Sequence, residues 1–386
     1  MIKIGILALG KKDDGGVYQY AQSIIDALKE DKNKIYIIFC NKNDDRFDKY
    51  DLETRKIDKP QNKISEKIIR VFQQLLCIRN PWFFTKKELD IFIDIDIFLS
   101  PSISIYPHFY LNKPFVFTLH DMQERYFPDF FSKKDKALRW LSRRALTRNA
   151  DKIICESSFV KKDIINFIGL NDEFKISVIQ SPPPEIFLNF KFDEKRLQIV
   201  KDKYNLTEKF IFYPAQYWFH KNHFKLVEAF KIVSKTFDDV HLILTGSKTN
   251  NYSVHNYNNL MQRIDELSLQ DRVKHLGYVD YEDLPYFYKM SQFLVMPSLF
   301  ESVSIPIYEA FALEVAVCSS NVTALPEQVG DAGLMFNPND IYDMAANMIK
   351  YLSDDSLRKE KAKLGFEKVK AFNHENYRTK LLEVFK

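Results

Sequence analysis

The sequence predicts an α/β protein built from two doubly wound domains. Short apolar runs of four to seven residues, rich in Ile, Val and Phe, alternate with longer amphipathic stretches. Runs of this kind suit parallel strands that helices cover on both faces. The alternation occurs twice, once on each side of Pro182-Pro183-Pro184, which can continue neither a helix nor a central strand. We therefore expect one domain before these prolines and a second domain after them.

Each half of the chain supplies six candidate strands. In chain order they lie at 2–8, 35–40, 95–99, 115–119, 152–155 and 175–179, and then at 210–213, 241–245, 274–276, 293–296, 316–319 and 334–336. Amphipathic patterns between them predict helices, most clearly at 17–28, 222–236 and 305–312. The first domain is expected at 1–184 and the second at 185–365, each the size of one doubly wound unit.

Composition excludes several classes of protein. No apolar run reaches the roughly 18–20 residues that span a bilayer, and the start of the chain shows no charged leader or small-residue cleavage site. The net charge of +4 gives no reason to expect a nucleic-acid partner. Four cysteines lie far apart without paired spacing, which favours a reducing cytosol and argues against structural zinc: Cys40, Cys77, Cys155 and Cys318.

Two polar motifs in the first half follow predicted strands, where parallel α/β sheets place their ligands. Gly15-Gly16 precedes the helix at 17–28, and paired glycines there let an anion or a sugar hydroxyl approach backbone N–H groups; a plain tight turn is the alternative. The strand at 115–119 is followed by His120-Asp121. His120 is suited to donating to a substrate hydroxyl or to stabilising developing charge.

The loop after the strand at 210–213 carries Lys221 close to the start of a helix. A lysine there adds a full charge to the field of the helix amides, which favours phosphate. His220 and His223 have a spacing that suits a metal, but no third ligand lies nearby in the sequence. Capping or packing is therefore the better interpretation of the two histidines.

The most specific pattern is the segment 297–310, in which a strand ends, a loop holds Glu301 and a helix carries Glu309. Apolar residues flank Glu309, and an ionised carboxylate is costly in such a setting unless it is paired or ligand-bound. A solvated surface acid is therefore the weaker interpretation of Glu309. Three amides open the same helix and are placed to hold a diphosphate: those of Val303, Ser304 and Ile305.

At these residues the sequence resembles the retaining glycosyltransferases of family 4, whose GT-B fold has two Rossmann-like domains facing a central cleft. The resemblance covers nearly the whole chain. Glu301 and Glu309 match the family's E-x7-E motif, and the segment 319–333 matches the stretch that follows it. The resemblance implies that Glu301 contacts the donor sugar, that Glu309 contacts the ribose of the nucleotide, and that Lys221 neutralises the donor diphosphate.

The resemblance also implies roles for the first half. It places Gly15-Gly16 near the donor phosphate and the acceptor, and it places His120 beside the donor sugar. The expected catalytic residues are thus His120, Glu301 and Lys221. In this fold the C-terminal helix, at about 366–386, crosses back to pack on the first domain.

One departure from the family concerns the donor diphosphate. Family members often carry Gly-Arg where this chain has Ala215-Gln216, so one cation is missing and Lys248 is a candidate replacement. This version of the loop looks like a subgroup of bacterial polysaccharide and lipopolysaccharide assembly. The other expected donor contacts are Gln216, Gly246, Ser247 and Tyr278.

Basic residues mark an acceptor side in the first half. From Arg55 to Lys87 there are nine basic residues against two acidic ones, with apolar residues at helical spacing among them. This pattern predicts a membrane-surface helix; a core-facing helix with solvated lysines is the alternative. A second basic stretch carries Arg139 and Arg143, which are expected to meet a lipid diphosphate and, with Asp121, to line the acceptor side.

The resemblance implies transfer of a hexose from a nucleotide diphosphate sugar to a hydroxyl of a growing, lipid-linked cell-surface glycan, with retention at the anomeric carbon. Mannose from GDP-mannose is the preferred donor, and the reaction is expected at the inner face of the cytoplasmic membrane. Asp94-Ile95-Asp96 begins a candidate strand instead of lying in a loop suited to Mg²⁺, so neither a metal nor another cofactor is expected. The alternatives are a rhamnosyl- or UDP-sugar-dependent transferase, a GT-B epimerase, a phosphorylase, and an inactive membrane-associated scaffold.

Overall fold

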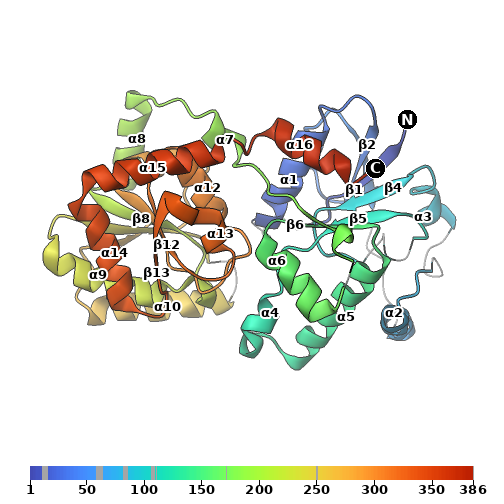
Figure 1. Ribbon diagram of the computed structural model, residues 1–386, viewed down its shortest axis with the longest axis horizontal. Helices are drawn as coiled ribbons and strands as arrows, with labels where there is room; N and C mark the ends of the chain where they lie inside the picture. The colour runs from blue at the N-terminus through green and yellow to red at the C-terminus, as the bar shows by residue number, and fades with distance from the viewer. Residues whose placement is uncertain are drawn as a thin grey trace. The chain divides into compact units, whose positions relative to one another are not determined.

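The computed structural model describes residues 1–10, 16–57, 64–80, 86–105, 109, 111–170, 172–248 and 251–385. The chain divides into two compact α/β units (Figure 1). The first unit comprises Met1–Ser181 and His374–Lys386, and the second comprises Pro182–Asn373. The chain therefore leaves the first unit directly before its run of three prolines.

The first unit is built on a seven-stranded sheet with strand order β3-β2-β1-β4-β5-β6-β7, in which neighbouring strands are parallel. Its strands are β1 (Lys3–Leu7), β2 (Ile35–Asn41), β3 (Glu53–Ile57), β4 (Ile97–Ser100), β5 (Phe115–Thr118), β6 (Lys152–Cys155) and β7 (Ile176–Val178). Ile4 and Ile6 of β1 join one buried cluster and Leu7 joins another. Each face of the sheet thus has a hydrophobic core of its own, as the continuous apolar runs predict.

The helices of the first unit cover these two faces. They are α1 (Gly16–Leu28), α2 (Ile64–Leu76), α3 (Lys86–Asp90), α4 (Gln123–Tyr126), α5 (Lys133–Asn149), α6 (Ser158–Asp163) and α16 (His374–Glu383). Although α16 comes from the end of the chain, it lies beside α1 in Figure 1, and its Tyr377 and Leu381 are buried in the same cluster as Ile24 of α1. The tail expected as one helix at 366–386 is thus divided, and only its second part belongs to the first unit.

The second unit has a six-stranded sheet of order β10-β9-β8-β11-β12-β13, also with parallel neighbours. Its strands are β8 (Phe210–Pro214), β9 (His241–Thr245), β10 (Val273–His275), β11 (Phe293–Met296), β12 (Val317–Ser320) and β13 (Gly333–Phe336). Its helices are α7 (Glu185–Leu188), α8 (Glu194–Tyr204), α9 (His223–Thr236), α10 (Asn251–Glu266), α11 (Leu284–Met290), α12 (Ile305–Ala312), α13 (Leu325–Val329), α14 (Ile341–Ser353) and α15 (Asp355–Val369). All twelve predicted strands are present, within two residues of their predicted ends.

Strand β3 was not predicted from the sequence, and its position in the sheet explains why. Its sequence, Glu-Thr-Arg-Lys-Ile, shows no apolar run. As the edge strand, β3 pairs only with β2 and places only Ile57 in the core. An edge strand with one covered face needs little hydrophobicity, so the pattern that revealed the central strands is missing here.

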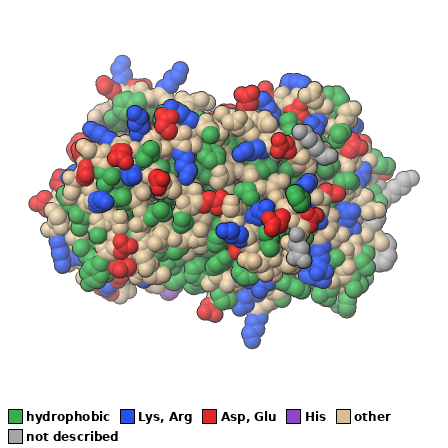
Figure 2. All heavy atoms as spheres, in the orientation of Figure 1, with side chains coloured by type: hydrophobic (Ala, Val, Ile, Leu, Met, Phe, Trp, Pro, Cys, Tyr) green, Lys and Arg blue, Asp and Glu red, His purple; other side chains and the backbone are tan. Residues whose placement is uncertain are grey.

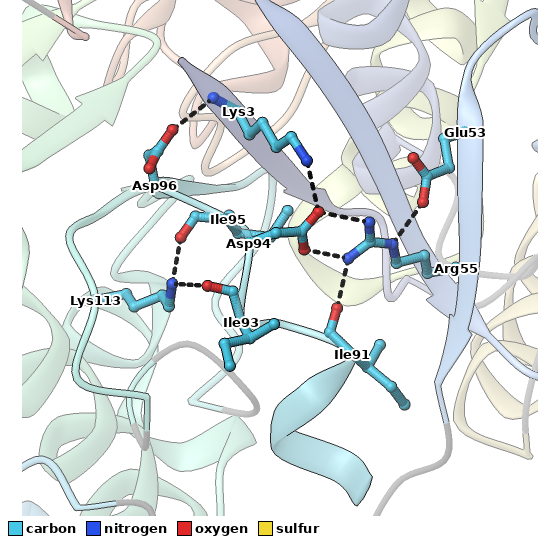
Figure 3. Close-up of polar contacts among 9 residues, drawn as sticks. All are labelled: Lys3, Glu53, Arg55, Ile91, Ile93, Asp94, Ile95, Asp96 and Lys113. Carbon is cyan, nitrogen blue, oxygen red and sulfur yellow. Dashed lines mark hydrogen bonds and ion pairs between the residues drawn. The ribbon is translucent and has the colours of Figure 1, made fainter. Parts of the chain in front are cut away.

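Arg55 of β3 is held in a polar network, not on a free basic surface (Figure 3). Its guanidinium bonds the Asp94 carboxylate through two nitrogens, at 2.6 and 2.9 Å, and donates to Glu53 at 2.7 Å. Lys3 donates to the same Asp94 at 2.8 Å, and the backbone N–H of Lys3 donates to Asp96. These bonds hold the pKa of Asp94 well below its usual range. The D-x-D pair therefore joins strands at the amino ends of β1 and β4, and Arg55 does not belong to a lipid-facing patch.

We predict that Asp94→Asn lowers the free energy of unfolding by about 1–2 kcal/mol, because charge-assisted hydrogen bonds to Arg55 and Lys3 are lost from a half-buried site. Since folding lowers the pKa of Asp94, this stabilisation is complete above the unfolded pKa of about 3.9 and disappears as the pH falls through the folded value. Urea denaturation at pH 7, 5 and 3 measures the difference, which should shrink only at pH 3.

The matched control is Asp48→Asn, which breaks the more exposed ion pair of Asp48 with Lys56. That change should alter the free energy of unfolding by less than about 0.5 kcal/mol. Equal effects of the two substitutions would contradict a special role for the Arg55 network.

Candidate functional site

Two loops meet at the carboxyl ends of β8 and β11 in the second unit. The backbone N–H of Leu299 donates to the carbonyl of His220 at 2.7 Å, which joins the loops directly. The side-chain amide of Asn222 donates to the carbonyls of Pro297 and Pro338, at 3.0 and 2.9 Å. Asn222 takes a left-handed backbone conformation with φ of 59°, and this reversal carries the chain into α9. The loops are therefore fixed to each other before any ligand is considered.

Lys221 and Glu301 form an ion pair where these loops meet. The Lys221 ammonium lies 2.6 Å from Oε1 of Glu301, and the hydroxyl of Ser298 donates to the same oxygen at 2.7 Å. Thr323 holds the Glu301 backbone on both sides, accepting from its N–H and donating to its carbonyl. Within the described residues, Oε2 of Glu301 and two of the three Lys221 donors have no hydrogen-bond partner. The pair can thus offer one acceptor and a positive charge to a polar ligand.

The loop after β9 approaches the loop after β8 very closely. Gly246 has φ of 151°, and a Cβ atom on it would lie 2.2 Å from the Ala215 carbonyl oxygen, so only glycine fits there. Ser247 follows it and is half-buried. Gln216 accepts a hydrogen bond from the Trp218 indole at 2.7 Å. Gly246, Ser247 and Gln216 therefore lie on adjoining loops at the same sheet edge as Lys221.

Two other expected donor contacts differ in their surroundings. The Lys248 ammonium lies 3.9 Å from the centre of the Tyr257 ring, where a cation–π contact holds it. Tyr278 is largely exposed, and it follows Gly277, whose carbonyl accepts from the Gly246 N–H at 2.8 Å. Lys248 and Tyr278 thus flank the Gly246 loop.

The start of α12 differs from the expectation in one respect. The backbone N–H of Ser304 donates to the side-chain carbonyl of Gln328 at 2.9 Å, and the amide of Gln328 donates back to the Ser304 carbonyl at 2.6 Å. The Ser304 N–H is therefore occupied and is not available to a diphosphate. The amides of Val303 and Ile305 have no partner within the described part of the chain, so the anion-binding end of α12 is narrower than the sequence suggested.

Glu309 lies one helix turn into α12 and is buried. Among the described residues its one hydrogen-bond partner is the Tyr288 hydroxyl of α11, which donates to Oε2 at 2.5 Å. Burial raises the pKa of Glu309 to about 7, although the hydrogen bond from Tyr288 acts in the opposite direction. Among the described residues, Glu301 forms an ion pair with Lys221, whereas Glu309 has no cation beside it. The two acids of the motif therefore differ in whether a positive charge balances the carboxylate.

His220 and His223 do not form a metal site with the described residues. Burial, together with the charge of Lys221, lowers the pKa of each imidazole to about 3, so both rings are neutral near pH 7. The His223 ring packs between Tyr213 and Tyr217, with ring centres 4.9 and 4.8 Å away. The described residues contain no group of three or more potential metal ligands. Packing, which the sequence favoured, accounts for His223.

In the first unit, His120 follows β5 and is largely buried. Its Nε2 lies 2.8 Å from the Pro101 carbonyl, and its Nδ1 lies 3.2 Å from the carboxylate of Glu156, which follows β6. Gly16 begins α1 and is exposed, whereas Gly15 lies outside the described residues. The first unit thus gathers an imidazole and a carboxylate at the carboxyl ends of β5 and β6.

On the acceptor side, Arg143 is buried and pairs with Glu124 and, at 3.5 Å, with Asp121. Arg143 is therefore a structural ion-pair partner and is not placed on the surface to meet a lipid diphosphate. Arg139 is more exposed and packs over the Phe131 ring at 4.7 Å. Beside Glu124 lies a hollow of about 300 Å³, which is lined by Glu124, Arg125, Lys136 and Trp140.

Helix α2 is amphipathic, but its apolar face points outward. Gln73 and Gln74 are 5% and 4% exposed, and Gln74 accepts from Ser142 of α5 at 3.1 Å. Phe72 and Leu76 are 59% and 66% exposed. Figure 2 shows hydrophobic and basic side chains side by side at the lower right, over the region of α2 and α5. The interpretation of α2 as a core-facing helix with solvated lysines is therefore wrong, because its polar face packs on α5 and its apolar face is exposed.

The basic segment around α2 is smaller than the sequence count suggests. Arg55 and Lys56 form ion pairs within the first unit, and Arg79 donates to the Lys113 carbonyl. Lys59 and Lys63 lie outside the described residues. None of the helices in the described part of the chain has the length and apolar character that crossing a bilayer requires.

Several residues of the site were missed in the sequence. Tyr288, Gln328 and Thr323 reach the motif of Glu301 and Glu309 from other elements, and no local pattern marks them. Glu156 could have been found, because it follows a predicted strand just as His120 does. The rule that ligands gather at the carboxyl ends of parallel strands applies equally to both.

Known structures share the two-unit architecture over the whole chain. Anabaena HepE in complex with UDP and glucose aligns with a TM-score of 0.77 and 17% identity, covering 100% of this chain and 99% of that chain. A glycosyltransferase from Rickettsia africae aligns with a TM-score of 0.74 and 18% identity, covering 100% and 98%. These similarities confirm the predicted α/β fold.

Family models match both units. The model described as Glycosyl transferases group 1 matches residues 194–367, and the model described as Glycosyltransferase Family 4 matches residues 14–182. The chain belongs to the GT-B glycosyltransferases. This membership confirms the resemblance seen in the E-x7-E motif of Glu301 and Glu309.

Curated relatives of this glycosyltransferase include O-antigen enzymes. The O-antigen chain mannosyltransferase B of Escherichia coli is 40% identical over 127 residues, which cover 33% of each chain. The serotype-specific mannosyltransferase WbdA of the same species is 26% identical over 57% of this chain and 27% of its own. RfbU, an O-antigen chain mannosyltransferase of Salmonella typhimurium, is 29% identical over 58% of this chain and 56% of its own. The matches thus span about a quarter to just over half of these relatives' lengths.

We predict that Glu309→Gln removes a pH dependence of stability. Because burial raises the folded pKa of Glu309 from 4.5 to about 7, the folded protein binds this proton more tightly than the unfolded chain. Wild-type stability should therefore fall by up to about 3 kcal/mol as the pH rises from about 4.5 to 7. Denaturant midpoints measured across this range should show a smaller slope in the variant.

The control is Glu282→Gln, which removes an exposed acid from the same unit. It should keep the wild-type slope. A Glu309→Gln protein with the wild-type slope would show that Glu309 is ionised throughout this range.

Proposed function

We propose that this glycosyltransferase transfers mannose from GDP-mannose to a hydroxyl of a growing cell-surface glycan of the O-antigen type, with retention at the anomeric carbon. The observation that carries the proposal is the Lys221–Glu301 ion pair, set beside the helix that carries Glu309. Relatives named O-antigen mannosyltransferases support the choice of sugar and acceptor. Because these relatives match only over part of their length, the identities of the donor and the acceptor are proposals here.

The donor roles follow from the geometry of the second unit. Glu309 accepts hydrogen bonds from the ribose hydroxyls, since Tyr288 is the one partner of its carboxylate within the described residues. Oε2 of Glu301 accepts from a hydroxyl of the donor sugar. Lys221 pairs with Glu301 and turns its remaining donors to the diphosphate. The amides of Val303 and Ile305, which have no partner among the described residues, support it.

The proposed reaction needs no covalent enzyme intermediate. The bond between the anomeric carbon and the diphosphate breaks, and the acceptor hydroxyl forms its bond to that carbon on the same face. The departing diphosphate takes the acceptor proton, and the nucleoside diphosphate leaves. Charge that develops on the leaving diphosphate is stabilised by Lys221 and the backbone amides. We propose that this stabilisation is sufficient without a divalent metal.

A UDP-sugar donor is the second candidate. Anabaena HepE is solved with UDP-glucose, with a TM-score of 0.77 to this chain. Gln216 stands where the family often has an arginine, on the loop that adjoins Gly246, and we propose that it shifts donor preference. The donor is therefore tested as a panel that includes both nucleotides.

We predict that purified protein is stabilised by GDP-mannose above other nucleotide sugars in a thermal-shift panel, and that it transfers mannose in the presence of EDTA.

Glu309→Ala should weaken GDP binding by about tenfold or more in calorimetry, because charge-assisted hydrogen bonds to the ribose are lost. Glu301→Ala should instead lower turnover far more than it lowers GDP affinity.

Three results would count against this assignment. A UDP-sugar that stabilises and reacts better would transfer the proposal to the second candidate. Loss of turnover in EDTA, restored by Mg²⁺, would remove the metal-free mechanism. Unchanged GDP affinity in Glu309→Ala would remove Glu309 from the nucleotide site.

We further propose that the acceptor is reached at an anionic membrane surface through the outward face of α2. The exposed Phe72 and Leu76 suit the boundary between lipid head groups and acyl chains, and the exposed Lys67 suits anionic head groups. The helix leaves this apolar face uncovered because its polar face packs on α5. The partner we propose is thus a lipid surface with negative charge.

We predict that the wild-type protein sediments with vesicles containing anionic lipid at low salt, and that a Phe72→Ser, Leu76→Ser double variant does so at least about fivefold less. Lys67→Glu should weaken sedimentation and its salt dependence, since each nearby cation contributes roughly 1 kcal/mol. Phe174→Ser is the control, because it removes an aromatic ring that is 91% exposed elsewhere in the same unit. Wild-type protein that stays in solution would favour a soluble acceptor.

A further inference from the structure

Both ring nitrogens of His120 face atoms that accept hydrogen bonds. Nε2 lies 2.8 Å from the backbone carbonyl oxygen of Pro101, and Nδ1 lies 3.2 Å from Oε2 of Glu156. A carbonyl oxygen can only accept, so Nε2 must carry a proton. An ionised carboxylate also only accepts, so the contact with Glu156 requires a second proton on Nδ1. The pair of contacts thus fits an imidazolium better than a neutral ring.

Glu156 is itself fixed at the end of β6. Its side chain is buried, and its second oxygen accepts a hydrogen bond from the Ser181 hydroxyl at 2.8 Å. Both carboxylate oxygens therefore serve as acceptors, one for Ser181 and one for His120. A buried carboxylate needs a compensating positive charge, and His120 is the group placed to supply it.

The other elements that pack against His120 are consistent with a positive ring. From α1, Tyr20 presents its ring edge-on at 4.8 Å, and its hydroxyl lies 3.1 Å from Thr118. Asp121 follows along the chain and also raises the pKa of His120, although Arg143 of α5 lies 3.5 Å from that carboxylate. Burial alone lowers the pKa of His120, but Glu156, Pro101 and Asp121 together raise it above its ordinary value.

We infer, on the basis of the proposed function, that Glu156 is a positioning residue that holds His120 as a doubly protonated cation with a fixed ring orientation. With both N–H groups given to protein acceptors, the ring offers the substrates its positive charge and its C–H edge. His120 is then not the base that removes the acceptor proton. This assignment agrees with a reaction in which the leaving diphosphate takes that proton.

The protonation state is tested first, without any substrate. Nitrogen-15 NMR of the imidazole signals, assigned with His120→Gln, should show both ring nitrogens of His120 protonated at pH 7. In Glu156→Gln the titration midpoint should fall by about one pH unit or more, which makes the ring at least about tenfold less protonated near neutral pH. A neutral His120 ring in the wild-type protein at pH 7 would overturn the inference, whatever the enzyme transfers.

Turnover gives the second test. Glu156→Gln should lower kcat for mannose transfer by about tenfold or more at pH 8 with little change in the KM for GDP-mannose, and should recover as the pH falls to 6. Ser181→Ala keeps the carboxylate and is the matched control, with less than about a threefold effect expected. In a His120→Gln background, Glu156→Gln should have almost no further effect.

The two tests separate the possible failures. If Glu156→Gln lowers kcat equally with and without His120, Glu156 supports the fold and does not position His120, and the inference is wrong. If no sugar is transferred by the wild-type protein, the proposed function fails, while the NMR titration still decides the state of His120.

Discussion

The ion pair between Lys221 and Glu301 is the contact on which the second unit's site depends. It joins the loop after β8 to the loop after β11 at 2.6 Å, and it gives the buried Glu301 carboxylate a cation as its partner. Removing either partner would leave the other charge uncompensated in a setting where that is costly. The backbone reversal at Asn222 helps to position this pair, because it places Lys221 at the end of the loop after β8. The side chain of Asn222 also donates to the Pro297 carbonyl, at the start of the loop after β11.

The two acids of the motif show how one local pattern can produce two different chemical groups. Glu301 has a cation and a hydroxyl on one oxygen, and its other oxygen has no hydrogen-bond partner among the described residues. Glu309, eight residues later, is buried with a single tyrosine donor, so it changes protonation near neutral pH. The same residue type thus acquires two different environments, through ion pairing at Glu301 and through burial at Glu309.

The sequence predicted the central strands well because both faces of each strand are covered, so burial appears as an unbroken apolar run. It missed β3, where an edge position removes that requirement, and it could not decide which face of α2 points inward. In the candidate site, the sequence pointed to Glu301, Glu309 and Lys221 because they follow strands or match a motif. Tyr288, Gln328 and Thr323 were missed because their contacts join separate elements, and such contacts leave no local spacing to detect.

The return of α16 to the first unit has a consequence for the order of folding during synthesis. Tyr377 and Leu381 complete the buried face that α1 shares with β1 and β2, yet they are synthesised only after the whole second unit. The second unit, by contrast, is a single continuous segment, Pro182–Asn373, and has all of its core residues earlier. The first unit is therefore begun before the second and completed after it, and a nascent chain ending at Ser181 would carry an apolar face without the helix that covers it.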